Sequence, residues 1–442
     1  MAIKYQALKG MDDLLPGEIE KWQWVETKAR TFFESRGFKE IRTPVLESTE
    51  LFSRSVGEAS DIVHKEMFSF KDRGDRDISL RPEMTASVAR AVIEHGLLKT
   101  NKSLRLYYLG PMFRAERPQA GRKRQFHQIG IEIINESNSE GWSVDFDAIF
   151  QLCTFLNYIG LNYFHLRLND LGDLAQQRQL ASKLKQYFLN QKSKLCSDCQ
   201  YRLEKNVLRI FDCKRENCQP VIDKAPRDKP SRAFEERLIP ALRGATFPFE
   251  VKIDPKIDSK LVRGLDYYNG TVFEVTTPAL GAQDAVAGGG RYDDLYSDLG
   301  GDPTPCVGFS IGMERLIVAL EKAGSSFSDK IHDKKTIYFA PLFEYPEFMP
   351  DTHEPNILTP YERVNEALTK LGESGFQPRY KGPLPKLSDH LKWANKMRAK
   401  YVVILGSEEI NKKAWTVKDM DKQEQVEVPF ENLISYFREI AI

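Results

Sequence analysis

The pattern of apolar and polar positions predicts a β-hairpin in the first third of the chain. Apolar side chains alternate with other residues along 104–112 and again along 128–134, and the turn-forming stretch 118–121 separates the two runs. Residues two apart in a strand share a face. We expect the first strand to continue through Glu116, so that Arg114 and Glu116 point to the same side and contact one ligand.

The second strand of this hairpin carries polar residues where a core would require apolar ones. Gln128, Gly130 and Glu132 share a face within an otherwise apolar run. A buried carboxylate is costly unless it is paired or bound to a ligand. The pattern therefore indicates a ligand-binding face, and an ordinary hairpin with one solvated face remains the alternative.

Helical periodicity precedes the hairpin. Apolar residues recur every three to four positions along 19–33, and Gly37 is the type of residue that ends a helix. The segment 38–46 then predicts a strand interrupted by Pro44, which is tolerated at a sheet edge or a bulge. An edge strand is where a second subunit can pair.

The chain changes character in its middle, where charged helical stretches and several prolines replace the alternating pattern. We therefore expect a helical insertion at 172–250 that divides one domain into two parts, 1–171 and 251–325. The second part contains a glycine-rich stretch at 287–292. It also contains a predicted strand that leads into a helix at 308–317, with glycines that permit close approach of a ligand.

A polar stretch at 324–329 has the composition of a linker, and we place a second domain after it, at 334–442. In this domain, predicted strands at 336–340 and 401–406 flank a predicted helix at 361–371. This alternation predicts a small α/β domain with a mostly parallel sheet.

Composition and charge change this picture only locally. The chain has 442 residues and a net charge of +1, so nucleic-acid contacts must come from basic patches such as Arg122, Lys123 and Arg124 at the hairpin tip. No apolar run reaches the roughly 18 residues of a membrane span, and the N-terminus lacks a signal-peptide core. Six cysteines do not make a disulfide framework in a chain of this length, so we expect a reducing, cytoplasmic setting.

Four of the cysteines form two pairs separated by thirteen residues: Cys196, Cys199, Cys213 and Cys218. The spacing is compatible with tetrahedral zinc. Apolar residues between the pairs favour the alternative, in which the thiols pack as small hydrophobic groups. The sequence leaves both interpretations open, and we assign no metal ligand to the functional site.

The sequence contains neither a P-loop nor a dinucleotide-binding fingerprint. A nucleotide's phosphates would then be held by arginines, whose guanidinium groups offer fixed, bidentate charge. Arg114, Arg263 and Arg315 lie in glycine-rich or aromatic segments where a ligand can approach. A structural salt bridge is the alternative role for each of them.

Five segments of the chain carry a family resemblance. The strand around Pro44, the hairpin 107–132 and the strand–helix unit 308–316 resemble the three motifs shared by class II aminoacyl-tRNA synthetases. The segments 261–268 and 288–293 resemble two that are peculiar to the histidyl-tRNA synthetase family, so they carry most of the specificity. The resemblance runs over nearly the whole length.

The resemblance implies an α+β catalytic domain with an antiparallel sheet flanked by helices, the helical insertion, and a C-terminal α/β anticodon-binding domain. It implies activation of L-histidine with ATP to histidyl-adenylate and pyrophosphate, followed by transfer of histidine to the 3′ end of tRNA(His). ATP with Mg²⁺ would be a substrate, and no organic cofactor or membrane would take part. A homodimer is implied by the resemblance alone.

By the same resemblance, five residues would bind ATP and support catalysis. Arg114 would contact the α-phosphate and the histidine carboxylate, and Arg263 would stabilise charge at the α-phosphate as pyrophosphate leaves. Glu116 would bind the adenine amino group, and Phe126 would stack on adenine opposite Arg315. Arg315 would also reach the γ-phosphate.

A second group of residues would bind histidine. Glu83, Thr85 and Gln128 would hold its α-ammonium group. Glu132 and Tyr268 would bracket the imidazole, whose two nitrogens each need a partner. The remaining implied contacts are Arg114, Arg263, Tyr267 and Tyr292, and a core role is the alternative for the two tyrosines. One departure from the familiar pattern is Met84, where a smaller residue is usual.

The hairpin tip would meet the acceptor stem of the tRNA. Arg122, Lys123 and Arg124 would contact phosphates, and Gln119 would contact a base. The C-terminal domain would read the anticodon. Three other interpretations are a synthetase-like regulatory subunit, a class II synthetase for another amino acid, and an RNA-binding module with a vestigial site. The segment 261–268 and the retained arginines argue against them.

Overall fold

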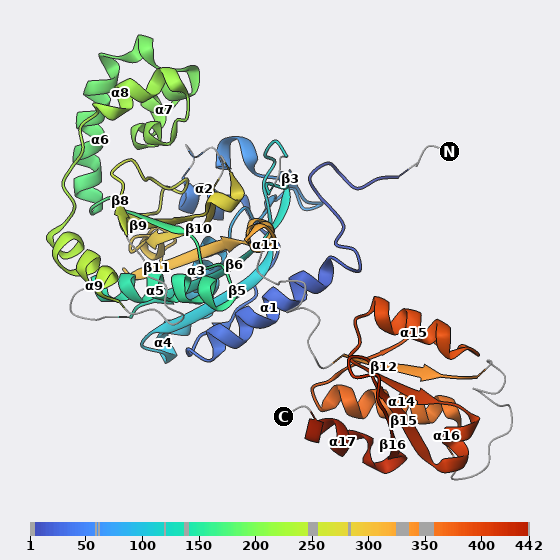
Figure 1. Cartoon of the computed structure of the whole chain (residues 1–442). Coiled ribbons are helices and arrows are strands. Elements are labelled where there is room, and N and C mark those ends of the chain that lie inside the picture. The colour runs from blue at the N-terminus through green and yellow to red at the C-terminus, as the bar shows by residue number, and fades with distance from the viewer. Residues whose placement is uncertain are drawn as a thin grey trace. The chain divides into compact units, whose positions relative to one another are not determined.

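The computed structural model describes residues 5–57, 60, 62–118, 121–136, 141–245, 255–281, 284–323, 336–343 and 358–440. It divides into two compact units, Met1–Ser325 and Ser326–Ile442. Figure 1 shows both units. The division falls within the stretch 324–329 that we predict to be a linker.

An eight-stranded sheet forms the centre of the first unit. Its strands, in spatial order, are β1 (Lys39–Glu40), β5 (Leu104–Phe113), β6 (Gln125–Ile134), β11 (Cys306–Gly312), β10 (Ala285–Arg291), β9 (Asn269–Thr276), β7 (His165–Asp170) and β8 (Lys256–Ile257). The pairs from β5 through β7 are antiparallel, and β1 and β8 pair in parallel at the two edges. The predicted hairpin and antiparallel sheet are confirmed.

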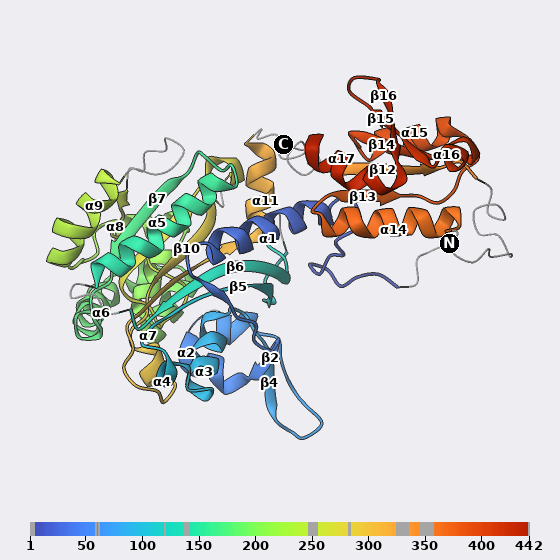
Figure 2. The same cartoon turned by 90° about the horizontal axis from the view of Figure 1, so that it is seen from below.

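The two faces of β5 and β6 differ, and the difference follows from the alternation along each strand. Helices α1 (Ile19–Glu34) and α5 (Trp142–Tyr158) cover one face, while α2 (Thr49–Val56) and α3 (Thr85–Glu94) lie on the other (Figure 2). On the α1 face, the Phe33 ring lies 5.1 Å from that of Phe155 and 6.3 Å from that of Phe309. The polar residues of β6 therefore face α3.

The first helix ends as its sequence predicts. Gly37 has a φ of +80°, and the amide of Phe38 donates to the carbonyl oxygen of Phe33 at 3.1 Å. A glycine adopts this left-handed conformation at no steric cost, which stabilises the helix end.

The single strand predicted for 38–46 is wrong. The segment contributes β1 at the edge of the large sheet and the start of β2 (Leu46–Ser48), which pairs with β4 (Asp77–Leu80); β4 in turn pairs with β3 (Ser69–Lys71). The guanidinium of Arg81 binds the connection instead, by donating to the carbonyl oxygens of Thr43 at 2.8 Å and Pro44 at 3.3 Å. The edge position of the first strand is confirmed.

The described part of 172–250 is helical. It contains α6 (Leu174–Leu189), α7 (Ser197–Lys205), α8 (Gln219–Asp223) and α9 (Ile239–Gly244), and its described residues form no strand. Helices α6 to α8 share a small core of their own, and Figure 1 shows them projecting from the sheet. The remaining short helices of the first unit include α4 (Leu97–Thr100), α10 (Leu295–Asp298) and α11 (Met313–Lys322).

The second unit contains a five-stranded sheet of strands β13 (Gln377–Tyr380), β12 (Thr336–Pro341), β14 (Tyr401–Leu405), β15 (Ala414–Asp419) and β16 (Gln425–Pro429), with helices α14 (Pro360–Glu373), α15 (Leu387–Lys396), α16 (Ser407–Lys412) and α17 (Leu433–Ile440). The α/β class is confirmed, but the mostly parallel sheet is not. Pairs β13–β12 and β12–β14 are parallel, whereas β14–β15 and β15–β16 are antiparallel. The short connection through α16 cannot provide the dozen or more residues of a parallel crossover.

Candidate active site

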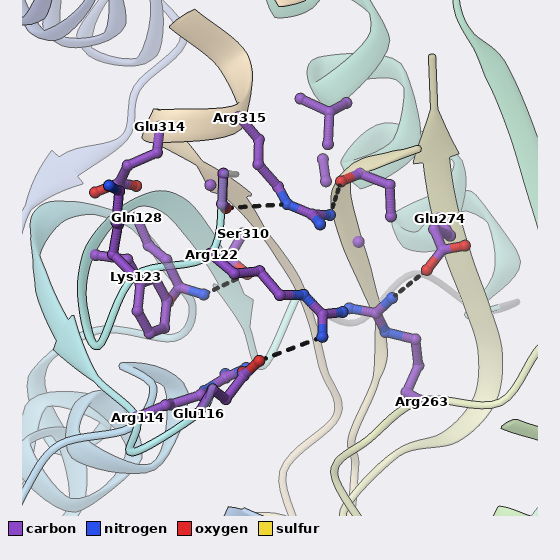
Figure 3. Close-up of a pocket in the computed structure, with 17 residues that line it drawn as sticks. Arg114, Glu116, Arg122, Lys123, Gln128, Arg263, Glu274, Ser310, Glu314 and Arg315 are labelled. Atoms are coloured by element: carbon purple, nitrogen blue, oxygen red, sulfur yellow. Dashed lines mark hydrogen bonds and ion pairs between the residues drawn. The ribbon is translucent and has the colours of Figure 1, made fainter. Parts of the chain in front are cut away.

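A cleft of about 240 Å³ opens on the first unit, lined by the β5–β6 hairpin, strands β9 and β10, and the junction of β11 with α11. Its charged lining residues are Arg114, Arg122, Lys123, Arg263 and Arg315, with Glu116, Glu274 and Glu314. Figure 3 shows these side chains converging from segments distant in the sequence. Because cations outnumber carboxylates, the cleft favours a polyanionic ligand.

The predicted strand through Glu116 is wrong, because β5 ends at Phe113. The amide of Arg114 still bonds across the hairpin to Arg124, at 2.8 Å, but the amide of Ala115 donates to the carbonyl oxygen of Glu66 at 2.6 Å. The chain leaves the sheet at that point. Arg114 and Glu116 nevertheless line the same cleft, with 3.9 Å between guanidinium and carboxylate.

Arg114 connects the cleft to the segment after β4. Its Nε donates to the carbonyl oxygen of Pro82 at 3.0 Å, and its guanidinium lies 5.1 Å from the centre of the Phe126 ring. Pro82 directly precedes Glu83. The residue predicted to contact both substrates therefore bridges the walls of the cleft and the loop that carries Glu83.

Arg263 reaches the cleft from the loop before β9. Its Nη1 donates to Glu274 at 3.1 Å. A Cβ at Gly288 of β10 would lie 2.4 Å from this nitrogen, so the guanidinium can occupy its place only against a glycine. Arg315, at the start of α11, donates from Nε to the carbonyl oxygen of Gly121 at 3.3 Å.

Behind the cleft, Glu132 lies in a buried pocket. Its carboxylate accepts a hydrogen bond from the hydroxyl of Thr85 at 2.7 Å and another from the hydroxyl of Tyr292. Glu83 accepts from the amides of Thr85 at 2.6 Å and Ala86 at 2.9 Å. Both carboxylates are almost wholly buried, so the solvated-face alternative for β6 is excluded.

Burial changes the proton affinities in this pocket. It raises the pKa of Glu132 to about 8, against the hydrogen bonds from Tyr292 and Thr85, and it also raises the pKa of Glu83. Burial raises the pKa of Tyr268 to about 12, while nearby Arg263 acts in the opposite direction. The Glu132 carboxyl group can therefore donate as well as accept a hydrogen bond near neutral pH.

Glycines make the space that these side chains occupy. Gly308 of β11 pairs with Glu132, and a Cβ there would lie 1.9 Å from Oε2 of Glu132. A Cβ at Gly130 would lie 2.3 Å from the Tyr108 ring, and one at Gly290 would lie 2.9 Å from Tyr268. The glycine-rich strands are thus the wall against which the pocket residues pack.

Gln128 lies between the pocket and the cleft. Its Nε2 donates to Ser310 at 3.3 Å, and its Oε1 is buried with no hydrogen-bond partner among the described residues. Such an unpaired buried acceptor is costly unless a ligand supplies a donor. Tyr267 completes the pocket, with its ring 4.7 Å from that of Tyr268 and its hydroxyl 3.5 Å from Glu83.

The sequence profile described as "Histidyl-tRNA synthetase" matches residues 10–316, and the one described as "Anticodon binding domain" matches residues 355–440. The chain belongs to the histidyl-tRNA synthetase family.

Relatives of the same family match over almost their full length. The histidine–tRNA ligase of Desulforamulus reducens is 39% identical over 97% of this chain and 98% of its own, and that of Syntrophomonas wolfei is 41% identical over 99% of each. The crystal structure of apo histidyl-tRNA synthetase from S. aureus superposes with a TM-score of 0.73 at 30% identity, covering 98% of this chain and 100% of that one. Together they bear out the class II catalytic fold with a C-terminal α/β anticodon-binding domain.

Among the described residues of this histidyl-tRNA synthetase family member, no helix combines the length and the apolar character needed to cross a membrane.

The basic tip of the synthetase hairpin is bound within the chain. Arg122 pairs with Glu116 at 3.2 Å, Lys123 pairs with Asp12, and Nε of Arg124 donates to the carbonyl oxygen of Glu116 at 3.3 Å. Arg122 and Lys123 also line the cleft. The fourth predicted tRNA contact, Gln119, lies outside the described residues.

Several residues of the synthetase site escape the sequence analysis, among them Glu274, Ser310 and Tyr108. Glu274 pairs with Arg263, Ser310 accepts from Gln128, and Tyr108 lies buried beside Glu132. A signal exists for Glu274, which is a charge within the apolar strand β9. Tyr108 has none, because a tyrosine in a strand is an ordinary core residue.

Proposed function

We propose that this chain works as a histidine–tRNA ligase. It activates L-histidine with ATP to histidyl-adenylate and pyrophosphate, and it transfers histidine to the 3′ end of tRNA(His). One observation supports this most strongly. A cation-rich cleft adjoins a buried polar pocket, and Gln128 and Arg114 lie where the two meet. Activation needs this arrangement, because the carboxylate of one substrate must reach the α-phosphate of the other.

For ATP, we assign the phosphates to the arginines of the cleft. Arg114 and Arg263 would contact the α-phosphate, where negative charge shifts to the leaving pyrophosphate, and Arg315 would contact the γ-phosphate. Glu116 would accept from the adenine amino group and Phe126 would stack on the ring. A histidine carboxylate oxygen would attack the α-phosphorus, so no protein nucleophile takes part.

We propose that ATP binds with Mg²⁺. Glu274 and Glu314 line the cleft and offer the oxygen ligands that Mg²⁺ takes together with phosphates. The ion would neutralise phosphate charge during the reaction.

For histidine, we assign the imidazole to Glu132 and Tyr268 and the α-ammonium group to Glu83, Thr85 and Gln128. The polarity of the pocket supports this assignment, because an apolar amino acid would leave its buried groups unpaired. A carboxyl group with a pKa of about 8 also suits imidazole, which offers one donor and one acceptor when neutral. Tyr267 and Tyr292 would hold the pocket in shape around the ring.

We assign the tRNA acceptor stem to Arg122, Lys123, Arg124 and Gln119, and the anticodon to the second unit. For Arg122, this role competes with its ion pair to Glu116, so tRNA phosphates would have to replace that carboxylate. We further propose a homodimer that uses the β1 edge, and a cytoplasmic location, consistent with six free cysteines.

Charging of tRNA tests the proposal. Purified full-length protein, ATP, Mg²⁺ and radiolabelled histidine are incubated with a tRNA(His) transcript and, as the control, with a transcript for another amino acid. We expect acid-precipitable label on tRNA(His) alone. Absence of label on both transcripts, in a preparation that binds ATP, would instead favour a synthetase-like regulatory subunit.

A further inference from the structure

The four sulfurs of Cys196, Cys199, Cys213 and Cys218 converge at one point of the helical insertion. All four Sγ atoms lie within 4.8 Å of one another, and those of Cys196 and Cys213 are 3.8 Å apart. The residues come from the start of α7, its first turn, and the two turns that follow. Sulfurs from three separate turns thus meet at one point within the small core of the insertion.

The sulfur spacing fits a metal better than a disulfide. Four ligands at Zn–S distances of about 2.3 Å in a tetrahedron have sulfurs roughly 3.8 Å apart. Bonded sulfurs would lie at about 2.0 Å. All six cysteines of the chain are free thiols, and the other two, Cys153 and Cys306, stand outside the cluster.

The surroundings of the cluster suit a negatively charged metal–thiolate centre. The amide of Cys196 donates to the sulfur of Cys218 at 3.2 Å, and the amide of Arg215 donates to that of Cys213 at 3.4 Å. Such donors stabilise thiolates. The segment 192–218 also contains seven lysines and arginines against four aspartates and glutamates, which offsets the net negative charge of zinc bound by four thiolates.

We propose that Cys196, Cys199, Cys213 and Cys218 bind one structural Zn²⁺ ion. The four ligands complete the coordination shell and leave no open position, so the ion takes no part in the chemistry. The ion stabilises the small core formed by apolar residues from α6 to α8 and the turns between them. A core of this size contributes little stability by itself.

The zinc site also fixes a segment that supports the catalytic cleft. Between the two cysteine pairs, Asn206 donates to Asp266 at 2.9 Å and Arg209 donates to the carbonyl oxygen of Arg263 at 3.3 Å. Cys199 and Cys213 enclose this segment on both sides. The ion therefore fixes both ends of the segment that contacts the Arg263 loop.

Metal analysis of the purified full-length chain is the first test. We expect one zinc per chain by plasma mass spectrometry, retained on gel filtration. Replacement by Co²⁺ should give the strong thiolate-to-cobalt charge-transfer absorption of a tetrahedral sulfur site. A chelator should lower the Tm by about 5 °C or more, and Zn²⁺ but not Mg²⁺ should restore it.

Variants locate the ion. Cys199→Ser and Cys218→Ser should bind about a tenth of the parental zinc or less. Cys153→Ala removes an equally buried thiol outside the cluster and should retain one zinc per chain.

Thiol counting keeps the proposal testable even where a variant fails to fold. The parent chain, denatured with chelator and without reductant, should expose six reactive thiols. Two reactive thiols would mean that the cluster forms two disulfides, which would overturn the proposal. Zinc-free protein that takes up no Co²⁺ and keeps its Tm in chelator would overturn it as well.

Discussion

Glu132 is a buried carboxyl group at the centre of the site. It lies in the centre of a buried strand, and the hydroxyls of Thr85 and Tyr292 are its partners. Neither partner is a cation, so burial dominates and raises the pKa of the carboxyl group to about 8. The pocket keeps an acidic group that is ready to share a proton with a ligand.

This raised pKa predicts a pH-dependent stability. From about pH 4.5, the ordinary pKa, to about pH 8, the folded chain retains a proton that the unfolded chain has released. The stabilisation is complete below this range and is lost as the pH rises through it. Glu132→Gln should therefore flatten the fall in the free energy of unfolding between pH 5 and 8, measured by urea denaturation. The exposed control Glu235→Gln should keep the parental slope, and a slope unchanged in Glu132→Gln would contradict the assignment.

Arg263 belongs to the reaction itself. Arg263→Ala should lower the rate of adenylate formation by about 100-fold or more while ATP still binds, because charge at the α-phosphate develops only in the transition state. Arg167→Ala is the matched control: Arg167 pairs with the same Glu274, at 2.9 Å, but does not line the cleft. Single-turnover kinetics measure both. A near-normal rate in Arg263→Ala would remove it from this role.

At this scale the sequence marks some residues and not others. Glu132 and Arg263 are recognisable because each breaks a local pattern or matches a family segment. The sequence does not show that the hydroxyls of Thr85 and Tyr292 both donate to the Glu132 carboxylate, because the three residues lie far apart in the chain. Tertiary folding alone brings them together.

Strands β10 and β11 carry glycines at the positions where a Cβ would collide with a site residue. Gly308 faces Glu132, and Gly288 faces Arg263, each across a distance that excludes a Cβ. A pocket for two large polar side chains is thus formed within a continuous hydrogen-bonded sheet.

Gly308→Ala tests this role. Its Cβ would lie 1.9 Å from Glu132 and 2.5 Å from the carbonyl oxygen of Ile131, so strand β11 or the carboxylate must move. We expect a loss of unfolding free energy on the order of 2 kcal/mol and a raised KM for histidine. Gly244→Ala, where nothing lies within 4 Å of the new Cβ, should leave the KM unchanged and should not lower the unfolding free energy. An unaltered KM and unfolding free energy in Gly308→Ala would show that the sheet can accommodate a Cβ at this position.

Alternation predicts most elements here, but not their ends or pairings. The hairpin, α1 and the β11–α11 unit follow from periodicity and breakers. The end of β5 does not, because the amide of Ala115 bonds to Glu66, which is distant in sequence. The mixed sheet of the second unit depends on the short connection from β14 to β15, and apolar runs alone do not reveal strand direction.

At the scale of the whole molecule, the edge strand of the large sheet is a candidate surface for pairing with a second copy of the chain. Strand β1 ends the large sheet, and Leu46, which begins β2 six residues after β1, is 44% exposed in the single chain. A paired edge in a homodimer would cover such surface.

Light scattering after gel filtration should give twice the chain mass of 50.7 kDa. Leu46→Glu should shift the mass toward one chain, because it places a charge on the exposed apolar surface that follows β1 in the chain. Leu189→Glu on α6, at a residue that is 51% exposed, should not. A parental mass of one chain would refute the homodimer.

The most direct test of the central claim is amino-acid-dependent exchange of labelled pyrophosphate into ATP, measured with the full chain, Mg²⁺ and each of the twenty amino acids in turn. The account predicts exchange with histidine alone. Exchange with a different amino acid would contradict the assignment of Glu132 and Tyr268 to the imidazole, and no exchange with any would contradict activation in this cleft.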